Sequence, residues 1–347
     1  FTFTGGTETI TLEDVGGAND HESRISSSLG EAVTFNHNPL SLDTVTIDTT
    51  SDSDPDTVDI VSLDGNFDAN LIVTASATST INTGTVDIGS GALDLTAGQI
   101  NVNGAFTTTG SVDINANAFD ITFGAAGSIN AGASDIDLTA FINVESLNVT
   151  TASEVRVTAT NGGINDLINH ALITADRVAL DAETGITGIE TNVNTLAAST
   201  TSGGFSIDNT GALEIGTVDL LSGITAAASS IFLTTTGTLL VSDAVTGGAV
   251  DLRSNDTMTI SDNVAASTGT LKLQNNGGDF VVNSPALVSN TGAFLIDIDS
   301  AGAVTLDDGS GVMSLGAGLI DIVAATDVAL STLTTGGNVT VTATTGA

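Results

Sequence analysis

The segments TVDIGSGALDLTAG (85–98) and SVDINANAFDITFG (111–124) decide the fold, because the second repeats the pattern of the first. The aspartates of their VDI triplets are 26 residues apart (113 − 87 = 26). Similar triplets, an aspartate between two aliphatic residues, recur at 58–60, 136–138, 218–220, 250–252, 296–298 and 320–322. A fixed period of roughly 20–50 residues is typical of repeat proteins. We therefore expect a chain built of stacked repeats.

Short runs in which apolar and polar residues alternate are separated by Gly, Asn, Asp or Ser, as in INVNG (100–104), EVRVTAT (154–160) and NVTVTAT (338–344). Alternation bounded by turn residues is typical of β-strands with one buried face. In the C-terminal third, three rows of such runs can be aligned. The alignment predicts two columns of stacked residues: Leu271 with Leu295 and Ile320, and Val281 with Val304 and Val328.

The rows predict an all-β chain folded as a parallel β-helix, a β-solenoid with three short strands and about 19–26 residues per coil. Leu147 and Leu172 fit a step of 25 (172 − 147 = 25), and Ile231 and Val250 fit a step of 19 (250 − 231 = 19). Coils stacked about 4.8 Å apart can pair their backbone groups and share one apolar core. Residues 57–347 are enough for roughly 12 coils, or a rod about 60 Å long.

Residues 1–56 differ from the repeats and are predicted to form a separate N-terminal β cap, arm or small β unit, with 57–347 as the β-helix rod. FTFTGGTETITLED (1–14) has strand character, whereas 17–31 is polar and typical of a loop. SDSDPD (51–56) is suited to a joint between the two parts.

Three further expectations concern local structure and the chain ends. INDLINHAL (164–172) has apolar residues at helical spacing, although the coil register favours strands and loop there. The chain begins with Phe1, which indicates a mature product or an excised portion of a longer protein. The last strand, in 338–347, has no polar cap, so its edge is expected to be covered by more chain or by another subunit. In one variant, the FTFTGG arm (1–6) of a neighbour adds as a strand.

The charge balance is strongly acidic: 41 Asp and Glu against 5 Lys and Arg give a net charge of −36. Nucleic acid and anionic lipid are therefore excluded as partners, because neither finds a basic surface. No apolar run is long enough to span a membrane as a helix, which excludes membrane insertion of that kind. The charge keeps a β-rich chain soluble, and together with the lack of cysteine it favours an extracellular, bacterial-type protein.

Patterns that indicate catalysis are weak. The chain has no Cys, and His21, His37 and His170 lie far apart in sequence without ligand spacing and are expected in loops. Trp and Tyr, on which sugars commonly stack, are absent. We therefore expect no enzymatic activity, although carboxylates of the kind that cleave polysaccharides are abundant.

Aspartates in the triplets are expected to face outward, next to those of the neighbouring coils. The predicted neighbours are Asp87 over Asp113, Asp94 over Asp120, and Asp297 over Asp321. Two unit charges about 5 Å apart in water repel by about 0.8 kcal/mol. Such a column is either a ladder of weak Ca²⁺ sites or, as the favoured alternative, a solvated acidic face.

The segment at 52–56 offers a different arrangement of aspartates. Asp52, Asp54 and Asp56 are spaced like the start of an EF-hand loop, but Thr57 and Leu63 stand where that loop needs Gly and Glu. A simpler calcium clip therefore competes with an acidic linker. Calcium is the one cofactor considered, and none is required; the candidates for weak calcium binding are Asp52, Asp54, Asp56, Asp87, Asp113, Asp297 and Asp321.

Several longer stretches resemble a known class of repeats: ITADRVALDAETGITG (173–188), SGGFSIDNTGALEIGTVDL (202–220) and GAVDLRSNDTMTISDNV (248–264). They resemble the repeats of filamentous-haemagglutinin-type adhesins and the β-helical passenger regions of large bacterial autotransporters. The resemblance covers roughly residues 57–347 and implies a secreted, surface-displayed, right-handed parallel β-helix used for adhesion, biofilm matrix or surface coating. The two-partner secretion domain of such adhesins is not recognisable in 1–56, which leaves the secretion route open.

The sequence therefore predicts a structural, non-enzymatic β-solenoid at a bacterial-type cell surface, as part of an adhesin, fibre, matrix or surface layer. Its expected partners are copies of itself, assembled end to end or by edge strands into filaments, and other surface or matrix components. One alternative is a module that binds carbohydrate or a calcium-bridged partner. A further alternative is a polysaccharide-degrading enzyme or phage tailspike.

Overall fold

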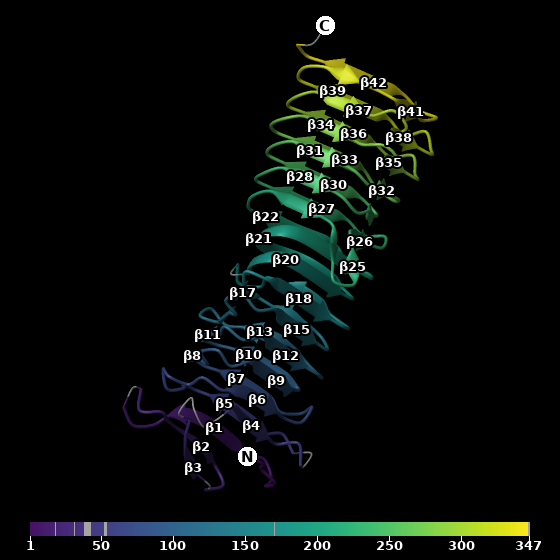
Figure 1. The fold of residues 1–347 in the computed structure, drawn as a ribbon. Helices are drawn as coiled ribbons and strands as arrows, with labels where there is room; N and C mark the ends of the chain where they lie inside the picture. The colour runs from purple at the N-terminus through teal and green to yellow at the C-terminus, as the bar shows by residue number, and fades with distance from the viewer. Residues whose placement is uncertain (18, 31, 38–42, 52–53, 170, 346–347) are drawn as a thin grey trace. The chain divides into compact units, whose positions relative to one another are not determined.

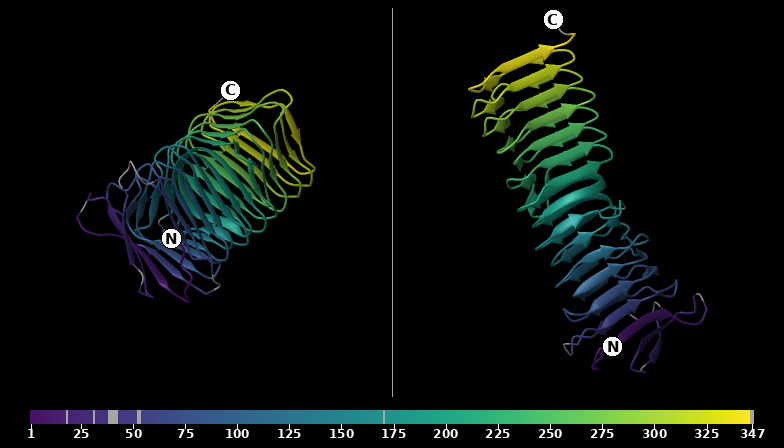
Figure 2. Two further views of the ribbon diagram at one scale, coloured as in Figure 1. Left: turned by 60° about the horizontal axis from the view of Figure 1, so that its bottom comes forward. Right: turned by 180° about the vertical axis from the view of Figure 1, so that it is seen from behind.

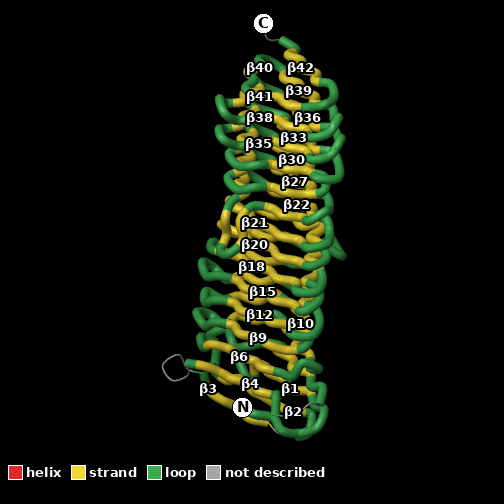
Figure 3. The backbone as a smooth tube through the Cα atoms, turned by 90° about the vertical axis from the view of Figure 1, so that its right-hand side faces the viewer, coloured by secondary structure: helices red, strands yellow, loops and turns green. Residues whose placement is uncertain are grey.

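The computed structural model describes residues 1–347 except 18, 31, 38–42, 52–53, 170 and 346–347. The chain divides into two compact units, Phe1–Asp176 and Arg177–Ala347. Within the described residues both units consist of strands and loops without a helix, drawn in yellow and green in Figure 3. The helical alternative for 164–172 is therefore wrong for the described part of that segment, where the end of a strand is followed by turns. None of the described elements is a helix long and apolar enough to cross a membrane.

Most strands are short. Those of the first unit are β1 (Thr9–Asp14), β2 (Glu22–Ser27), β3 (Ala32–Asn36), β4 (Thr44–Asp48), β5 (Thr57–Ile60), β6 (Asn70–Thr74), β7 (Thr80–Thr83), β8 (Val86–Asp87), β9 (Leu93–Ala97), β10 (Gln99–Val102), β11 (Ala105–Thr107), β12 (Val112–Ala116), β13 (Ile121–Phe123), β14 (Ser128–Asn130), β15 (Ile136–Ala140), β16 (Val144–Glu145), β17 (Asn148–Thr150), β18 (Glu154–Ala159) and β19 (Gly163–Asn165). β20 (Leu172–Ala182) begins in the first unit and ends in the second. Those of the second unit are β21 (Gly185–Thr200), β22 (Phe205–Asn209), β23 (Leu213–Ile215), β24 (Thr217–Val218), β25 (Leu221–Ser222), β26 (Ile224–Ala226), β27 (Ile231–Thr235), β28 (Leu239–Val241), β29 (Val245–Gly247), β30 (Val250–Ser254), β31 (Met258–Ile260), β32 (Val264–Ala266), β33 (Leu271–Asn275), β34 (Phe280–Val282), β35 (Leu287–Asn290), β36 (Ile296–Ser300), β37 (Val304–Leu306), β38 (Gly311–Ser314), β39 (Ile320–Ala324), β40 (Val328–Ala329), β41 (Thr332–Thr334) and β42 (Val339–Ala343).

In the first unit, successive coils contribute strands to three parallel ladders, seen in the purple-to-teal part of Figure 1. One ladder runs through β4, β6, β9, β12, β15 and β18. A second runs through β5, β7, β10, β13, β16 and β19, and the third through β8, β11, β14 and β17. Leu93, Val112 and Ile136 pair in successive coils at steps of 19 (112 − 93) and 24 (136 − 112) residues.

The second unit has the same three-ladder arrangement (Figure 2). β21 forms most of a coil by itself, because it pairs parallel with β22, β23 and β26, from which the three ladders continue. Phe205, Ile231 and Val250 pair at steps of 26 (231 − 205) and 19 (250 − 231), so the predicted step between Ile231 and Val250 is confirmed. The predicted fold, an all-β parallel β-helix with coils of 19 to 26 residues, is confirmed in each unit.

Inward-facing positions of the ladders fill the core of each unit with aliphatic side chains. In the first unit Leu95, Ile114 and Leu138 stack on one another, and each residue is at most 1 % exposed. In the second unit Leu273 and Ile298 stack in the same way and are fully buried. Each coil therefore relies on its neighbours to cover its apolar residues, which makes the stacking cooperative.

The residue that ends each strand of the first ladder differs between the two units. In the first unit this corner position holds stacked alanines: Ala97, Ala116, Ala140 and Ala159. In the second unit it holds buried polar residues: Asn209, Thr235, Ser254, Asn275 and Ser300. Asn275 Nδ2 donates to the carbonyl oxygens of Gly277 (2.8 Å) and Gly278 (2.9 Å). These side chains give turn carbonyls the hydrogen bonds that buried backbone groups require.

A hairpin interrupts the regular turns of the second unit. β24 and β25 pair antiparallel within the longest coil step of that unit. Val218 is buried against Ala179 and Ala197, whereas Leu220 at the tip is 91 % exposed. The hairpin is therefore held by a small apolar cluster of its own.

The segment predicted as an N-terminal cap, arm or small unit contains β1 to β4. β1 pairs antiparallel with β2, β2 pairs antiparallel with β3, and β1 also pairs parallel with β5. β4 pairs parallel with β6 and so belongs to a coil ladder. The FTFTGG arm lies against β4 of its own chain, because the Phe1 ammonium donates to Thr46 O (2.7 Å) and Phe3 N donates to Asp48 O (3.0 Å).

The register predicted for the C-terminal third is wrong by one residue at Leu295. Ile296, not Leu295, pairs with both Leu271 and Ile320. Ile296 is fully buried, while Leu295 is only half-buried. The two are adjacent apolar residues, so alternation alone did not decide which of them faces inward.

Two other predicted columns are wrong for the same reason. Phe280 occupies the inner column in which Val281 was placed, and Val281 is half-buried on the other face of its strand. The predicted column of Leu147 and Leu172 is also displaced, because Leu172 pairs with Asn148 and is 40 % exposed.

Candidate functional site

A column of three aspartates lies on the outer face of the first unit. Asp94, Asp113 and Asp137 pair in successive coils, and Arg156 follows in the next coil. Arg156 Nε lies 3.7 Å from Asp137 Oδ1. Burial, and then the charge of Asp94, raise the pKa of Asp113 above its ordinary value. The column is therefore a line of repelling charges that ends at a cation.

The two aspartate pairs predicted for this region are wrong. Asp113 pairs with Asp94 rather than with Asp87, and Asp87 pairs with Thr107. Asp94 therefore does not lie over Asp120. Each coil here carries two similar triplets, and the second triplet of one coil stacks on the first triplet of the next at a step of 19 (113 − 94) instead of 26.

In the second unit the outer column contains a lysine. Asp251, Lys272, Asp297 and Asp321 pair in successive coils, so the predicted placement of Asp297 over Asp321 is confirmed. Lys272 Nζ donates to Asp297 Oδ2 (2.9 Å) and to Asp299 Oδ2 (3.2 Å). The hydrogen bond to Asp297 is the main cause that raises the pKa of Lys272. A side-chain cation therefore balances the carboxylate that was predicted to need calcium.

The remaining predicted calcium candidates are separated in the structure. Asp52 lies outside the described residues, and Asp54 is exposed. Asp56 is 4 % exposed, and its Oδ1 accepts a hydrogen bond from Glu8 N (3.1 Å). Asp56 thus joins the N-terminal segment to the coils, which is a structural role. Asp87 is exposed and accepts a hydrogen bond from the next turn.

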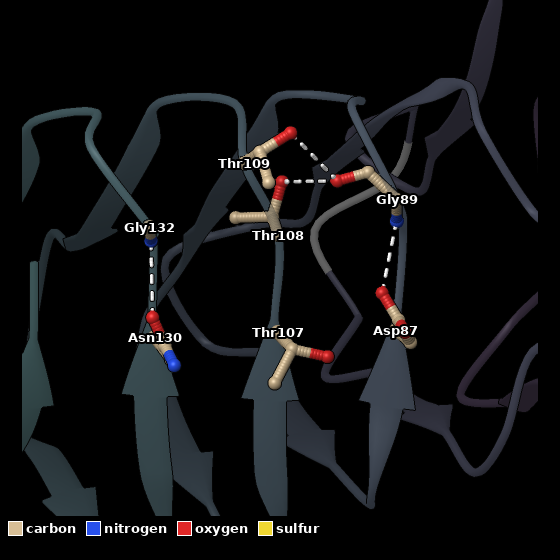
Figure 4. A pocket seen from close by; sticks show the side chains of 7 residues that line it. All are labelled: Asp87, Gly89, Thr107, Thr108, Thr109, Asn130 and Gly132. Atoms are coloured by element: carbon tan, nitrogen blue, oxygen red, sulfur yellow. Dashed lines mark hydrogen bonds between the residues drawn. The ribbon is translucent and has the colours of Figure 1, made fainter.

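Asp87 borders a solvent-exposed hollow of about 380 Å³ in the first unit (Figure 4). Its wall is made of Asp87, Gly89, Thr107, Thr108, Thr109, Asn130 and Gly132. Asp87 Oδ1 accepts from Gly89 N (3.0 Å), and Asn130 Oδ1 accepts from Gly132 N (3.0 Å). Asp87 is the only carboxylate in the wall, so the hollow lacks the pair of carboxyl groups that glycoside hydrolysis commonly uses.

One acidic group in the described part of the chain has the geometry of a metal site. Asp14, Asp20 and Asp64 each offer a carboxylate oxygen, and these oxygens lie within 4.8 Å of one another. Asp14 ends β1, Asp20 lies in the loop between β1 and β2, and Asp64 lies in the loop between β5 and β6. The parallel pairing of β1 with β5 brings these loops together. None of the three was predicted as a site residue.

Asp64 is the buried member of this acidic triad and is fully enclosed. Its Oδ2 accepts from Asp20 N (2.9 Å), and its Oδ1 accepts from Asn66 N (2.8 Å). Burial acts to raise the pKa of Asp64, but the backbone N–H donors of Asn66, Asp20 and His21 outweigh it, so the pKa is lowered. Asp64 is therefore a buried carboxylate that stays ionised at neutral pH.

Two histidines adjoin the triad. His21 and His37 lie in loops, as predicted, but their rings are 5.9 Å apart although 16 residues separate them in sequence (37 − 21 = 16). His37 is 1 % exposed, packs against Phe67 at 4.9 Å between ring centroids, and has no hydrogen-bond partner for either ring nitrogen. Burial lowers the pKa of His37, while the charges of Asp64 and Asp14 act in the opposite direction. His170 lies outside the described residues.

The triad concentrates negative charge. Two unit charges 4.8 Å apart repel by roughly 1 kcal/mol in water and roughly 3 kcal/mol at an effective dielectric of about 20. The Asp14 Oδ1 atom is also buried and lacks a hydrogen-bond partner among the described residues. A cation at this place would relieve the repulsion and give that oxygen a partner.

The chain was also compared with models of protein families, with curated proteins and with solved structures. None of the three comparisons found a match.

Proposed function

We propose that this chain is a structural, non-enzymatic β-solenoid module of an extracellular surface or matrix protein of a bacterial-type cell. The observation that carries the proposal is the unbroken register of the inner columns. Residues such as Ile100 and Ile121 in the first unit, and Val250 and Leu271 in the second, pair coil after coil and are at most 1 % exposed. Such stacking stabilises a long repeat without any binding site.

The outer faces support the same role. They carry short polar side chains that bond to their coil neighbours, as when Asn82 Nδ2 donates to Asp59 Oδ1 (2.8 Å) and Asn101 Nδ2 donates to Asn82 Oδ1 (2.8 Å). With a net charge of −36, the surface repels other acidic chains and stays soluble in a medium where salt screens the repulsion. These properties suit a surface coat, fibre or matrix component.

Surface display gives a direct test. The chain is fused to an outer-membrane anchor on a host bacterium, and cell–cell aggregation and attachment to abiotic surfaces are measured. The matched control is the chain with Ile296→Asp, which places a charge in the buried column. We expect the native chain to change aggregation or attachment and the control to lose the effect. Equal behaviour of native and control chains, or cleavage of a polysaccharide panel by the purified protein, would contradict the proposal.

A module for calcium-mediated binding is the second candidate, and the acidic triad of Asp14, Asp20 and Asp64 favours it. In that case the attachment of displaying cells depends on divalent ions and is lost in chelator. Attachment that persists unchanged in chelator supports the purely structural role.

A further inference from the structure

We propose that Asp14, Asp20 and Asp64 bind a hard divalent cation, with Ca²⁺ preferred over Zn²⁺, and that this ion fastens the loop after β1 to the loop after β5. The site is distinct from the outer aspartate columns. It belongs wholly to the first unit, at the junction between the antiparallel N-terminal strands and the coils.

The donor atoms determine the preferred ion. Three carboxylate oxygens lie within 4.8 Å of one another, a spacing that lets one ion contact all three. Hard cations such as Ca²⁺ prefer oxygen donors and complete their coordination with carbonyl oxygens and water. Asp64 contributes a buried charge held in place by the backbone N–H groups of Asp20 and Asn66, so one donor is already oriented.

The His37 imidazole is an independent indication that something is bound here. His37 is 1 % exposed, and neither ring nitrogen has a hydrogen-bond partner. Buried polar groups in proteins nearly always have a partner, which is often an ordered water. The charges of both Asp64 and Asp14 act on this imidazole, which places it beside the triad. Water bound to an ion at the triad would give His37 the partner that the protein does not.

The position of the site suggests what the ion does. Asp14 and Asp20 belong to β1 and the loop that leads into β2, whereas Asp64 belongs to the coils. The two parts are already joined by the pairing of β1 with β5 and by the hydrogen bond from Asp14 N to Ser62 Oγ (3.2 Å). An ion at the triad adds a second fastening, and the N-terminal strands should then resist local unfolding better when it is bound.

Isothermal titration calorimetry of the full chain tests the site, with the protein stripped by chelator and titrated with CaCl₂, MnCl₂ or ZnCl₂ alone. Physiological salt suppresses diffuse binding to the acidic surface. The variants are Asp14→Asn and the exposed Asp20→Asn, which removes a donor without touching the buried Asp64. Asp113→Asn, in the outer column, is the control because it removes the same charge elsewhere.

We expect one class of Ca²⁺ site with a stoichiometry of one, which Asp14→Asn and Asp20→Asn each weaken by about tenfold or more, while Asp113→Asn leaves it within about twofold. Hydrogen exchange of β1 and β2 should slow when Ca²⁺ is added and should not slow in Asp20→Asn. No stoichiometric binding by the native chain, or equal weakening in all three variants, would overturn the site. Binding of Zn²⁺ but not Ca²⁺ would overturn the assignment of a hard ion.

Discussion

Replacing Ile296 by alanine is expected to destabilise the chain far more than replacing its neighbour Leu295 by alanine. Ile296 is fully buried and pairs with Leu271 on one side and Ile320 on the other. Leu295 precedes it and is half-buried, because successive side chains of a strand point to opposite faces. The pair therefore tests the register of the coils to within one residue.

The magnitude follows from what each substitution removes. Ile296→Ala deletes three buried carbon atoms, worth about 2.4 kcal/mol at about 0.8 kcal/mol each. The cavity left between two stacked residues adds to this loss, so the total should fall between about 2 and 5 kcal/mol. Leu295→Ala should cost about 1 kcal/mol or less, because its side chain is partly in water already and leaves no closed cavity.

Urea unfolding followed by circular dichroism measures both values. The chain has no Trp or Tyr to serve as a fluorescent reporter, so the β-sheet signal is the suitable probe. The unfolding midpoint and its slope are compared for the native chain and both variants, since a change of slope would indicate that unfolding is no longer a single transition. Equal losses of stability, or a greater loss for Leu295→Ala, would place Leu295 in the column and refute the register.

Three further outcomes can be measured in the same way. Asn275→Ala should lower the free energy of unfolding by about 1–3 kcal/mol, because two buried turn carbonyls lose their donor, and an unchanged midpoint would argue against that role. Lys272→Met should cost about 1 kcal/mol at low salt and less at high salt. Because the pKa of Lys272 is raised in the folded chain, its contribution is full below the ordinary lysine pKa and is lost as the pH rises through the raised value, so native and variant stabilities should converge in strong alkali. Asp113→Asn should stabilise the chain at neutral pH by at most about 1 kcal/mol, because burial and Asp94 raise the pKa of Asp113 and stability is lost as the pH rises from the ordinary aspartate pKa to the raised one. Below the ordinary pKa the native chain and this variant should be equally stable.

The fold was predictable because two signals agree over most of the chain. Alternation within runs such as EVRVTAT (154–160) identifies strands, and the recurrence of those runs identifies coils. The exact register was less accessible, because segments such as FLIDI (294–298) place apolar residues side by side. Only packing against both neighbouring coils decides that Ile296 faces the core.

The acidic triad was beyond what local patterns indicate. Asp20 and Asp64 are 44 residues apart, and the loops that carry them resemble ordinary turns. Their proximity follows from the pairing of β1 with β5, which joins a strand of the antiparallel segment to a strand of the coils. By contrast, the aspartates of the triplets stand out in the sequence, yet at Asp297 the balancing charge comes from Lys272.

The unequal coil steps of the second unit have an evolutionary consequence. The step that contains the β24–β25 hairpin is seven residues longer than the next one (26 − 19 = 7), yet the inner columns on either side stay paired. New segments can thus enter at a corner without disturbing the stacked interior. A lineage carrying such a chain could therefore vary its outward loops freely, and acquire new specificities there, while its scaffold remained under little selective strain.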